Sequence, residues 1–442
     1  MLKTFRIGGI HPPENKLSKN KAIENIPLPK QAVVFLSQHL GTPAVPVVQK
    51  GDKVKVGTLL AKSGSFVSTN THSPVSGKIL KIDSVFDAGG HKCPAAFVDV
   101  EGDVWEETID RTETLKTDCN LSPKEIIDKI TDAGIVGMGG ATFPTQVKLL
   151  PPSGMEAEVL IINAVECEPY LTSDHALILE KGEEIMIGIS ILMKAAGVEK
   201  TIIGIENNKK DAIEHLRNLS RNYPGIKVEA LKVKYPQGGE KQLIEALINR
   251  RVPSGGLPVA VGAIVQNIAT AYAVYEAVQK NKPLIERVVT ITGKKLAKPC
   301  NALVRIGTPA NELIDFAGGF PDDTAKIISG GPMMGKTLIN DEIPIGKGTS
   351  GILLMPSFET QRKEMRNCIR CAKCVNVCPM KLIPSQMMNA AQFNEWELVG
   401  KMSITDCMEC GSCSYVCPAN RPLLDYIRLG KSVVTKKMKG MK

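Results

Sequence analysis

Two stretches near the carboxyl end, CIRCAKCVNVCP at residues 368–379 and CMECGSCSYVCP at residues 407–418, repeat one cysteine pattern. Each stretch places four cysteines as CxxCxxCxxxC and follows the last one with proline, so eight of the chain's 12 cysteines lie here. The chain's start, MLKTFRIGGIHPPENK, has no apolar segment of the length that a secretory signal needs, which predicts a cytoplasmic protein with reduced thiols. Dense, regular cysteine spacing in a reducing compartment indicates metal rather than disulfides.

The spacing is that of bacterial ferredoxins, in which three thiolates of one run hold an iron–sulfur cubane and the fourth, before proline, reaches the other cubane. We therefore predict two [4Fe-4S] clusters. Zinc is the alternative, but zinc sites take two separated cysteine pairs rather than two runs of four. The predicted ligands of cluster A are Cys368, Cys371, Cys374 and Cys417, and those of cluster B are Cys407, Cys410, Cys413 and Cys378.

The whole chain has the composition of an ordinary globular protein. Its 442 residues are 43% hydrophobic and 23% charged, which excludes a disordered chain, a collagen and a coiled coil. At about 150 residues per domain, the length predicts about three domains. The longest apolar stretch, residues 257–278, is interrupted by Pro258, two amide side chains and Glu276, which favours a buried strand and helix. We therefore expect that the chain does not cross a bilayer by itself.

The charge balance is basic, with 55 Lys and Arg against 46 Asp and Glu, a net charge of +9. Part of the excess lies in the carboxyl-terminal tail. This tail is expected either to meet anionic lipid or an acidic partner, or to be a solvated terminus. Its lysines are Lys431, Lys436, Lys437, Lys439 and Lys442.

A glycine-rich loop, GIVGMGGATFP at residues 134–144, is the first sign of a ligand site upstream. Glycines let a backbone turn tightly and approach a phosphate or an aromatic ring. The loop does not complete a Rossmann fingerprint, because Thr142 stands where that pattern needs glycine or alanine and Pro144 follows shortly. Taken alone, the loop is equally consistent with a plain turn.

Three further loops follow predicted strands. A β-prone run at residues 157–165 ends in the acidic loop ECEPY, and a second strand, residues 226–233, leads into YPQGGE and a helix from about Glu240. The segment VQNIAT, residues 265–270, repeats the order of strand, polar turn and helix. Ligands bind at the carboxyl edge of α/β sheets and at helix N-termini, so these loops are expected to share one site.

Together these segments carry a resemblance to known proteins. GMGGATFPTQVK, NAVECEP, YPQGGE and VQNIAT, in this order and at about these separations, resemble the FMN- and NADH-binding subunit of respiratory complex I. With its flanking regions, the whole chain resembles the C subunits of Rnf ion-translocating electron-transport complexes. Three residues depart from the complex I pattern: Met138 replaces Arg, Val165 replaces Asp and Gly239 replaces Glu.

The resemblance implies a multidomain α/β fold. The first module resembles the barrel-sandwich of lipoyl carriers, but Ser68 to Thr71 occupy the turn where a carrier has its lysine, so we interpret it as a packing module. The implied modules are a barrel-sandwich hybrid at 1–110, an FMN- and NAD(H)-binding α/β domain at 111–285, a β-grasp domain at 286–356 and a two-cluster ferredoxin-like domain with a basic tail at 357–442.

The resemblance also implies site residues, each of which has a bland alternative as a solvated, capping or core residue. Those implied for FMN are Gly137, Gly139, Lys148, Asn163, Glu166, Tyr235, Gly238, Gly239, Asn267 and Thr270. Those implied for NAD(H) are Gly140, Ala141, Phe143, Lys148, Glu168 and Glu240.

The implied function is that of a peripheral protein on the cytoplasmic side of the cell membrane. It would exchange a hydride between NAD(H) and FMN and pass single electrons through two [4Fe-4S] clusters. It would belong to a complex that couples electron transfer between ferredoxin and NAD(H) to the translocation of Na⁺ or H⁺. No side chain is expected to perform acid–base chemistry, and no nucleic acid is expected. The alternatives are a soluble flavo-iron–sulfur enzyme like the cobalamin reductases, or a non-catalytic electron wire with a vestigial flavin site.

One motif is a false lead. Gly330, Gly335, Lys336 and Thr337 satisfy GxxxxGK[ST], the pattern of a phosphate-binding loop. That loop requires a helix after the motif, whereas Pro344 and further glycines follow within about ten residues. We therefore expect Met333 and Met334, inside the motif, to pack against a neighbouring domain.

Overall fold

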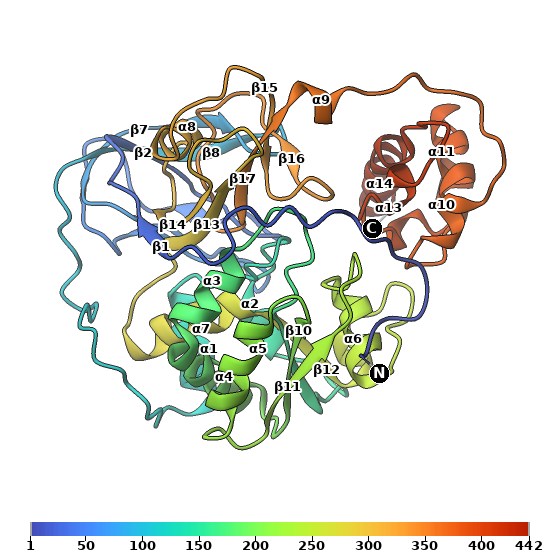
Figure 1. Cartoon of the computed structure of the whole chain (residues 1–442). Helices are drawn as coiled ribbons and strands as arrows, with labels where there is room; N and C mark the ends of the chain where they lie inside the picture. Colours follow the sequence, from blue (N-terminus) through green and yellow to red (C-terminus); the bar gives the residue numbers. More distant parts are fainter. Residues whose placement is uncertain (1, 441–442) are drawn as a thin grey trace.

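Three of the four predicted modules are built on β-sheets and the fourth is helical, in a computed structural model that describes residues 2–440 (Figure 1). The side chains are described as far as Met438. Among the described residues, no helix combines the length and the apolar character that spanning a membrane requires.

The barrel-sandwich module packs a four-stranded sheet, ordered β2-β8-β7-β4, against a three-stranded sheet, ordered β3-β5-β6. Alternate side chains of these strands, among them Val34, Leu60 and Ile79, form its buried core. The strands are β2 (Gln31–Phe35), β3 (Val45–Pro46), β4 (Lys53–Val54), β5 (Leu59–Lys62), β6 (Thr71–His72), β7 (Gly77–Phe86) and β8 (Lys92–Val100).

The turn before β6 is buried against the next module. The carbonyl oxygen of Ser68 accepts a hydrogen bond from Gln146 Nε2 at 2.7 Å, and Asn70 Nδ2 donates to the carbonyl of Asp132 at 3.2 Å. The tip that carries the modified lysine in lipoyl carriers is therefore held between two modules here.

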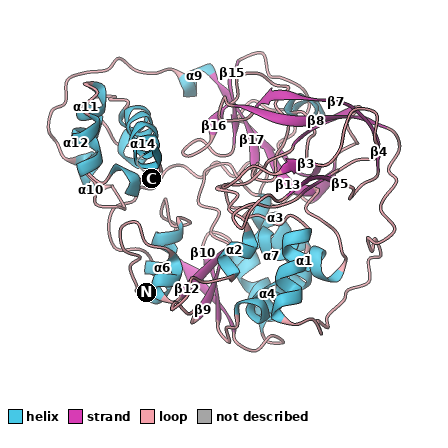
Figure 2. Ribbon diagram, turned by 180° about the vertical axis from the view of Figure 1, so that it is seen from behind, coloured by secondary structure: helices cyan, strands magenta, loops and turns pink. Residues whose placement is uncertain are grey.

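The second module is a parallel sheet ordered β11-β10-β9-β12. Its strands are apolar on both faces because both faces are covered: Leu160 and Ile162 face one core cluster, and Val159 and Ile161 face another. Figure 2 shows α6 on one side of the sheet and α1, α4 and α7 on the other. The elements are α1 (Pro123–Asp132), α2 (Thr145–Leu149), β9 (Val159–Asn163), α3 (Ser173–Glu180), α4 (Gly182–Ala196), β10 (Thr201–Glu206), α5 (Lys210–Ser220), β11 (Ile226–Leu231), α6 (Glu240–Ile248), the 3-10 helix η1 (Pro258–Val261), β12 (Ala263–Asn267) and α7 (Ile268–Gln279).

The third module is a mixed sheet ordered β1-β14-β13-β17-β15-β16. Its first strand comes from the amino-terminal segment, which pairs in parallel with β14 rather than with the barrel-sandwich sheets. The false phosphate-binding motif forms the turn between β15 and β16, and no helix begins there. The elements are β1 (Ile23–Asn25), β13 (Glu286–Thr292), β14 (Cys300–Arg305), α8 (Ala310–Phe316), β15 (Thr324–Ser329), β16 (Lys336–Thr337) and β17 (Gly351–Pro356).

The fourth module is a small helical domain around the cysteines, with Met387, Met388 and Ile427 in its core. Residues 431–440 continue the last helix, and Lys431 Nζ donates to the carbonyl of Cys407 at 2.6 Å, so this lysine is not part of a free tail. Lys442 lies outside the described residues, as does the side chain of Lys439. The helices are α9 (Ser357–Thr360), α10 (Lys373–Asn376), α11 (Pro384–Gln392), α12 (Trp396–Lys401), the 3-10 helix η2 (Ile404–Asp406), α13 (Ser412–Tyr415) and α14 (Leu423–Gly440).

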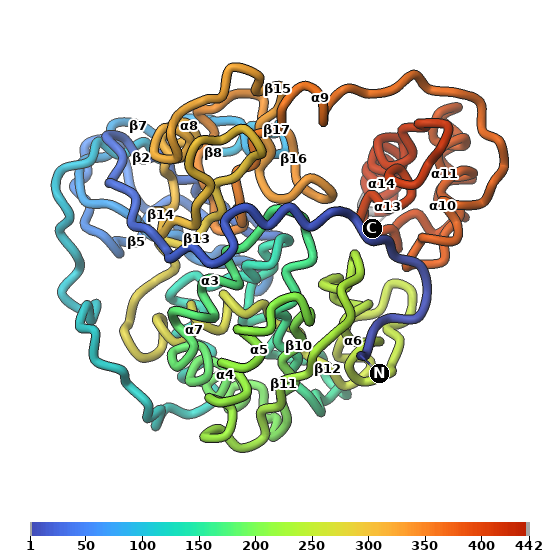
Figure 3. Tube along the Cα trace, viewed as in Figure 1, coloured from blue at the N-terminus to red at the C-terminus, as the bar shows by residue number. Residues whose placement is uncertain are grey.

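The amino-terminal segment ties these modules together. Figure 3 shows this segment running from the sheet of the third module, past the second module, to the fourth, which we call the cluster module. Gly9 donates its N–H to the carbonyl of Val377 at 2.9 Å, and Ile10 and Tyr235 exchange two backbone hydrogen bonds. A Cβ on Gly8, whose φ is +73°, would lie 2.6 Å from the carbonyl carbon of Cys378, so glycine is required at this close approach.

One buried lysine joins the three sheet modules. Lys347 is 1% exposed, and its Nζ donates to the carbonyl oxygens of Asn70 at 2.8 Å and Gly134 at 2.7 Å. Burial of the ammonium lowers the pKa of Lys347 to about 7.

This lysine predicts a pH dependence of stability. An unfolded lysine keeps its proton up to its ordinary pKa, 10.5, whereas folded Lys347 releases it near pH 7, so folding expels a proton between these values. The free energy of unfolding should therefore rise with pH over this window by about 1 kcal/mol per unit, relative to Lys347→Met, which lacks the titration. Urea unfolding followed by tryptophan fluorescence between pH 7 and 9.5 measures it. The exposed Lys50→Met is the control, and parallel curves for wild type and Lys347→Met would contradict the expectation.

Candidate flavin and iron–sulfur site

The four loops singled out from the sequence meet at the carboxyl edge of the parallel sheet. Asn163, at the end of β9, donates from Nδ2 to the carbonyl of Gly238 at 2.8 Å. The N–H of Met138 donates to Thr270 Oγ1 at 2.9 Å, which fixes the glycine loop on the first turn of α7. A Cβ on Gly139 would lie 3.3 Å from Cβ of Asn267. We call residues 137–144, 163–171, 235–240 and 265–270 the flavin loops.

The donor groups of these loops fit a phosphorylated flavin. Helix α6 begins at Glu240 with no side chain capping its first amides, and Gly238 and Gly239 precede it, which is the arrangement that binds phosphate groups. Lys148 Nζ is close by, 2.8 Å from Glu240 Oε1 and 3.0 Å from the carbonyl of Val265. The buried Gln266 side chain has no hydrogen-bond partner for either polar atom, and neither has Gln237 Nε2. Buried amides of this kind are normally paired, so they leave donors and an acceptor for a ligand.

The residues implied for NAD(H) divide into two groups. Gly140 and Ala141 are exposed, as is the neighbouring Gly139 of the FMN set, and a Cβ on Gly140 would meet open space, so this rim is accessible from outside. Phe143 and Glu240 are half-buried beside it. Glu168 differs, because its carboxylate faces the other modules: it accepts from the N–H of Met333 at 3.1 Å and of Met334 at 2.8 Å. Burial raises the pKa of Glu168 to about 7, although the two N–H donors act to lower it.

Glu166 has a structural partner set. Its carboxylate accepts from the N–H of Asp174 at 2.8 Å and lies 3.3 Å from Ser173 Oγ. The carboxylate thereby caps the first turn of α3. Asp174 in turn accepts from Asn267 Nδ2 at 2.8 Å. Burial, with the nearby charge of Glu166, raises the pKa of Asp174 to about 7. The acidic loop is therefore locked to α3 and to the start of α7.

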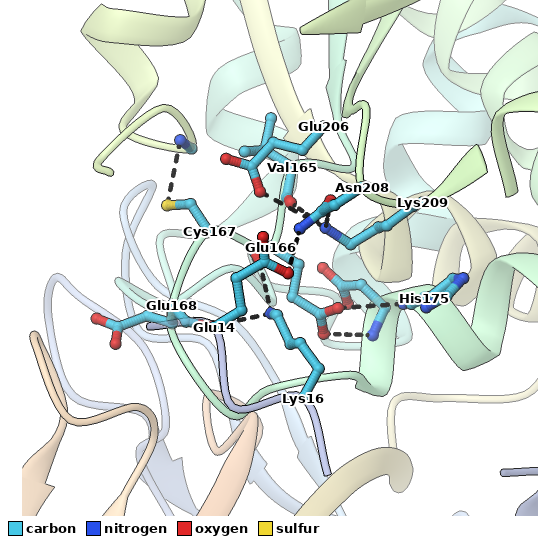
Figure 4. A network of polar contacts seen from close by, with 12 residues as sticks. Glu14, Lys16, Val165, Glu166, Cys167, Glu168, His175, Glu206, Asn208 and Lys209 are labelled. Carbon is cyan, nitrogen blue, oxygen red and sulfur yellow. Dashed lines mark hydrogen bonds and ion pairs between the residues drawn. The ribbon is translucent and has the colours of Figure 1, made fainter. Parts of the chain in front are cut away.

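Lys16 organises the same loop, and nothing in the sequence signalled it (Figure 4). Its Nζ donates to the carbonyl oxygens of Glu166 and Glu168, both at 2.9 Å, and to that of Leu171. A second lysine, Lys209, donates to the carbonyl of Val165 at 2.8 Å and lies 3.6 Å from Glu206 Oε2. Two ammonium groups from distant parts of the chain thus hold the backbone of the acidic loop.

The eight cysteines of the repeat fall into two groups. Cys378 lines a small cavity with Cys407, Cys410 and Cys413. Cys417 lines another with the first three cysteines of the repeat. These are the sets predicted for clusters B and A. Among the described residues, no group of three or more His, Cys, Asp or Glu side chains is placed to hold a single metal ion.

The two cavities differ in their surroundings. Cluster B's cavity adjoins the flavin loops: Tyr235 is 2% exposed and its hydroxyl donates to the carbonyl of Cys410 at 2.9 Å. Met408 also reaches this loop, since a Cβ on Gly239 would lie 2.5 Å from its Cε. Cluster A's cavity is on the outside, where Cys368 and Cys371 are exposed.

Comparison with known families confirms the four-module fold and the cofactors. Residues 130–276 match the Nuo51 FMN-binding domain, and residues 3–103 match the RnfC barrel sandwich hybrid domain. Residues 288–337 match the SLBB domain, and residues 367–421 match the 4Fe-4S dicluster domain. The chain therefore carries an FMN-binding domain and a two-cluster iron–sulfur domain, as predicted.

Close relatives cover the chain from end to end. The C subunit of the proton-translocating ferredoxin:NAD(+) oxidoreductase complex of Clostridium ljungdahlii is 48% identical, over 98% of this chain and 94% of that protein. The C subunit of the Na(+)-translocating complex of Acetobacterium woodii is 41% identical, over 99% and 98%. A solved NAD+-reducing [NiFe]-hydrogenase aligns at 18% identity with a TM-score of 0.49, over 72% of this chain and 67% of that chain. On the strength of the two full-length relatives, the chain belongs to the C-subunit family of ion-translocating ferredoxin:NAD+ oxidoreductase complexes.

Proposed function

We propose that this chain is the NAD(H)-facing subunit of its complex, bound peripherally on the cytoplasmic side of the membrane. Its partners are the other subunits, ferredoxin and NAD(H). FMN, when bound, supplies the chemistry that accepts a hydride and releases electrons one at a time. A nicotinamide gives two electrons at once and an iron–sulfur cluster takes one, so the two cannot exchange electrons directly. The proposed order of centres is the flavin loops, then cluster B, then cluster A.

The chain's own residues supply binding and orientation. The uncapped amides of α6 and Lys148 are proposed to hold the flavin phosphate, while Asn163, Asn267 and Thr270 fix the loops around the ring. The exposed rim at Gly139 to Ala141 leaves access for the dinucleotide. No side chain would be required as an acid or base for the hydride step, because the hydride would pass directly between the two bound cofactors, and the proton left when the electrons move on would be released to water.

The contact between Tyr235 and Cys410 is the observation that carries the proposal. It joins a flavin loop directly to a predicted ligand of cluster B, with 2.9 Å between the hydroxyl and the carbonyl oxygen. The exposed cluster A is then the exchange point with the next redox partner.

Anaerobic addition of NADH to the reconstituted protein tests this function. In stopped-flow absorbance, the flavin band is expected to bleach first and the cluster bands to follow. When cyanocobalamin is added as an electron acceptor, the protein with NADH should reduce it no faster than free FMN with NADH does. Clusters that respond only to dithionite, with no flavin released on denaturation, would instead identify a non-catalytic wire. Rapid cobalamin reduction would favour the cobalamin reductase alternative.

A further inference from the structure

The turn between β15 and β16, residues 330–335, lies where three modules meet. In Figure 1 it points from the third sheet toward the helical cluster module. Met333 packs in one apolar cluster with Tyr235 and Cys410. A Cβ on Gly411 would lie 3.0 Å from the carbonyl oxygen of Met333, and Arg428 donates to the carbonyl of Met334 at 3.4 Å. The segment that imitates a phosphate-binding loop is thus occupied with contacts between modules.

Glu168 holds this turn in place. One carboxylate oxygen, Oε2, accepts from the N–H of Met333, and the other, Oε1, accepts from the N–H of Met334. The fit is close, because a Cβ on Gly331 would collide with Oε2. The backbone of Glu168 is fixed as well, since its carbonyl accepts from Lys16 Nζ.

The same carboxylate reaches toward cluster B. Tyr235 Oη lies 3.4 Å from Glu168 Oε1 and donates to the carbonyl of Cys410. A continuous series of polar contacts therefore runs from the β15–β16 turn through Glu168 and Tyr235 to the backbone of Cys410. Each oxygen of Glu168 already accepts from a backbone N–H group of the β15–β16 turn, so the carboxylate is directed toward that turn.

We propose that Glu168 is a positioning residue for electron transfer: by pinning the β15–β16 turn between the flavin domain and the cluster module, it fixes the separation of the flavin loops from cluster B. This inference rests on the proposed function, because it takes the flavin as the redox partner of cluster B. It assigns Glu168 a role different from the dinucleotide contact that the family resemblance implies. A small change in the separation of two reacting groups has a large effect on rate, so the junction matters to turnover.

Glu168→Gln tests the role with little change in size. A carboxamide presents an N–H₂ to one of the two backbone N–H groups, so one of the pair loses its acceptor. The rate of flavin bleaching by NADH and the KM for NADH should stay within about twofold, while transfer from flavin to clusters slows by about tenfold or more. Hydrogen exchange of residues 331–335, measured on the same protein, should accelerate.

Gly331→Ala disturbs the junction from the other side and should reproduce both effects, although it alters no residue of the flavin domain. Met334→Ala is the matched control, because it removes an exposed side chain but keeps the N–H that Glu168 accepts. A raised KM in Glu168→Gln with unchanged flavin-to-cluster transfer would overturn the proposal and make Glu168 a dinucleotide ligand, and no change at all would also overturn it. If NADH fails to bleach flavin in the unaltered protein, the proposed function fails, while the exchange measurement still tests the pinning of the turn.

Discussion

Replacing Cys410 with alanine is expected to leave NADH able to bleach the flavin while cluster A stays oxidised. The substitution removes a ligand of cluster B, which is the centre that adjoins the flavin loops. Without it, electrons must cross from the flavin to cluster A directly. Electron transfer slows steeply as the distance between two centres grows, so cluster A should be reduced much more slowly by NADH than in the unaltered protein. Stopped-flow absorbance with NADH, together with an iron count of the purified variant, measures it.

Cys371→Ala is the matched variant at the other cluster. Cys371 is exposed and lines the outer cavity rather than the one that adjoins the flavin loops, so NADH should still reduce the flavin and cluster B. Transfer to an external acceptor protein should then be the step that fails. If Cys410→Ala passes electrons to cluster A at the normal rate and Cys371→Ala does not reduce cluster B, the order of the two clusters is the reverse of the one proposed.

The sequence predicted the parts of the site that depend on local pattern. Spacing alone grouped Cys378 with the second run and Cys417 with the first, and the structure lines the two cavities with those sets. The apolar run before Glu166 forms β9, buried on both faces, and the predicted helix from about Glu240 is α6. These features are predictable because a strand, a helix start and a cluster motif each leave a signal within a few residues.

The parts that depend on distant contacts left no such signal. Lys16 binds backbone carbonyls, which every residue has, so no complementary side chain marks its partners. The family resemblance implies a dinucleotide contact for Glu168. The direction of its side chain, however, depends on a turn that lies more than 160 residues further along the chain. The strand β1 is three residues long and belongs to a sheet whose other members begin at residue 286. Such placements are set by the packing of modules rather than by local propensity.

Lys16→Met is expected to weaken FMN binding about tenfold to 100-fold and to lower the thermal unfolding midpoint. Its ammonium donates to three carbonyl oxygens of the acidic loop, and a hydrogen bond to a charged group contributes about 1.5–3 kcal/mol. Methionine matches the length of the side chain but leaves those carbonyls unpaired in a partly buried place. The same loop carries Asn163, which bonds to Gly238 in the next flavin loop, so loosening one loop loosens the flavin cradle.

Electrostatic attraction acts in the same direction. Burial lowers the pKa of Lys16 and the negative charge of Glu166 opposes that shift, so the loop loses this attraction in Lys16→Met. Titration of deflavinated protein with FMN gives the dissociation constant. Lys19→Met is the control on the same segment, because Lys19 donates to one exposed carbonyl, that of Asn208 at 3.0 Å. An unchanged FMN dissociation constant in Lys16→Met would mean that the acidic loop keeps its shape without the hydrogen bonds of the Lys16 ammonium.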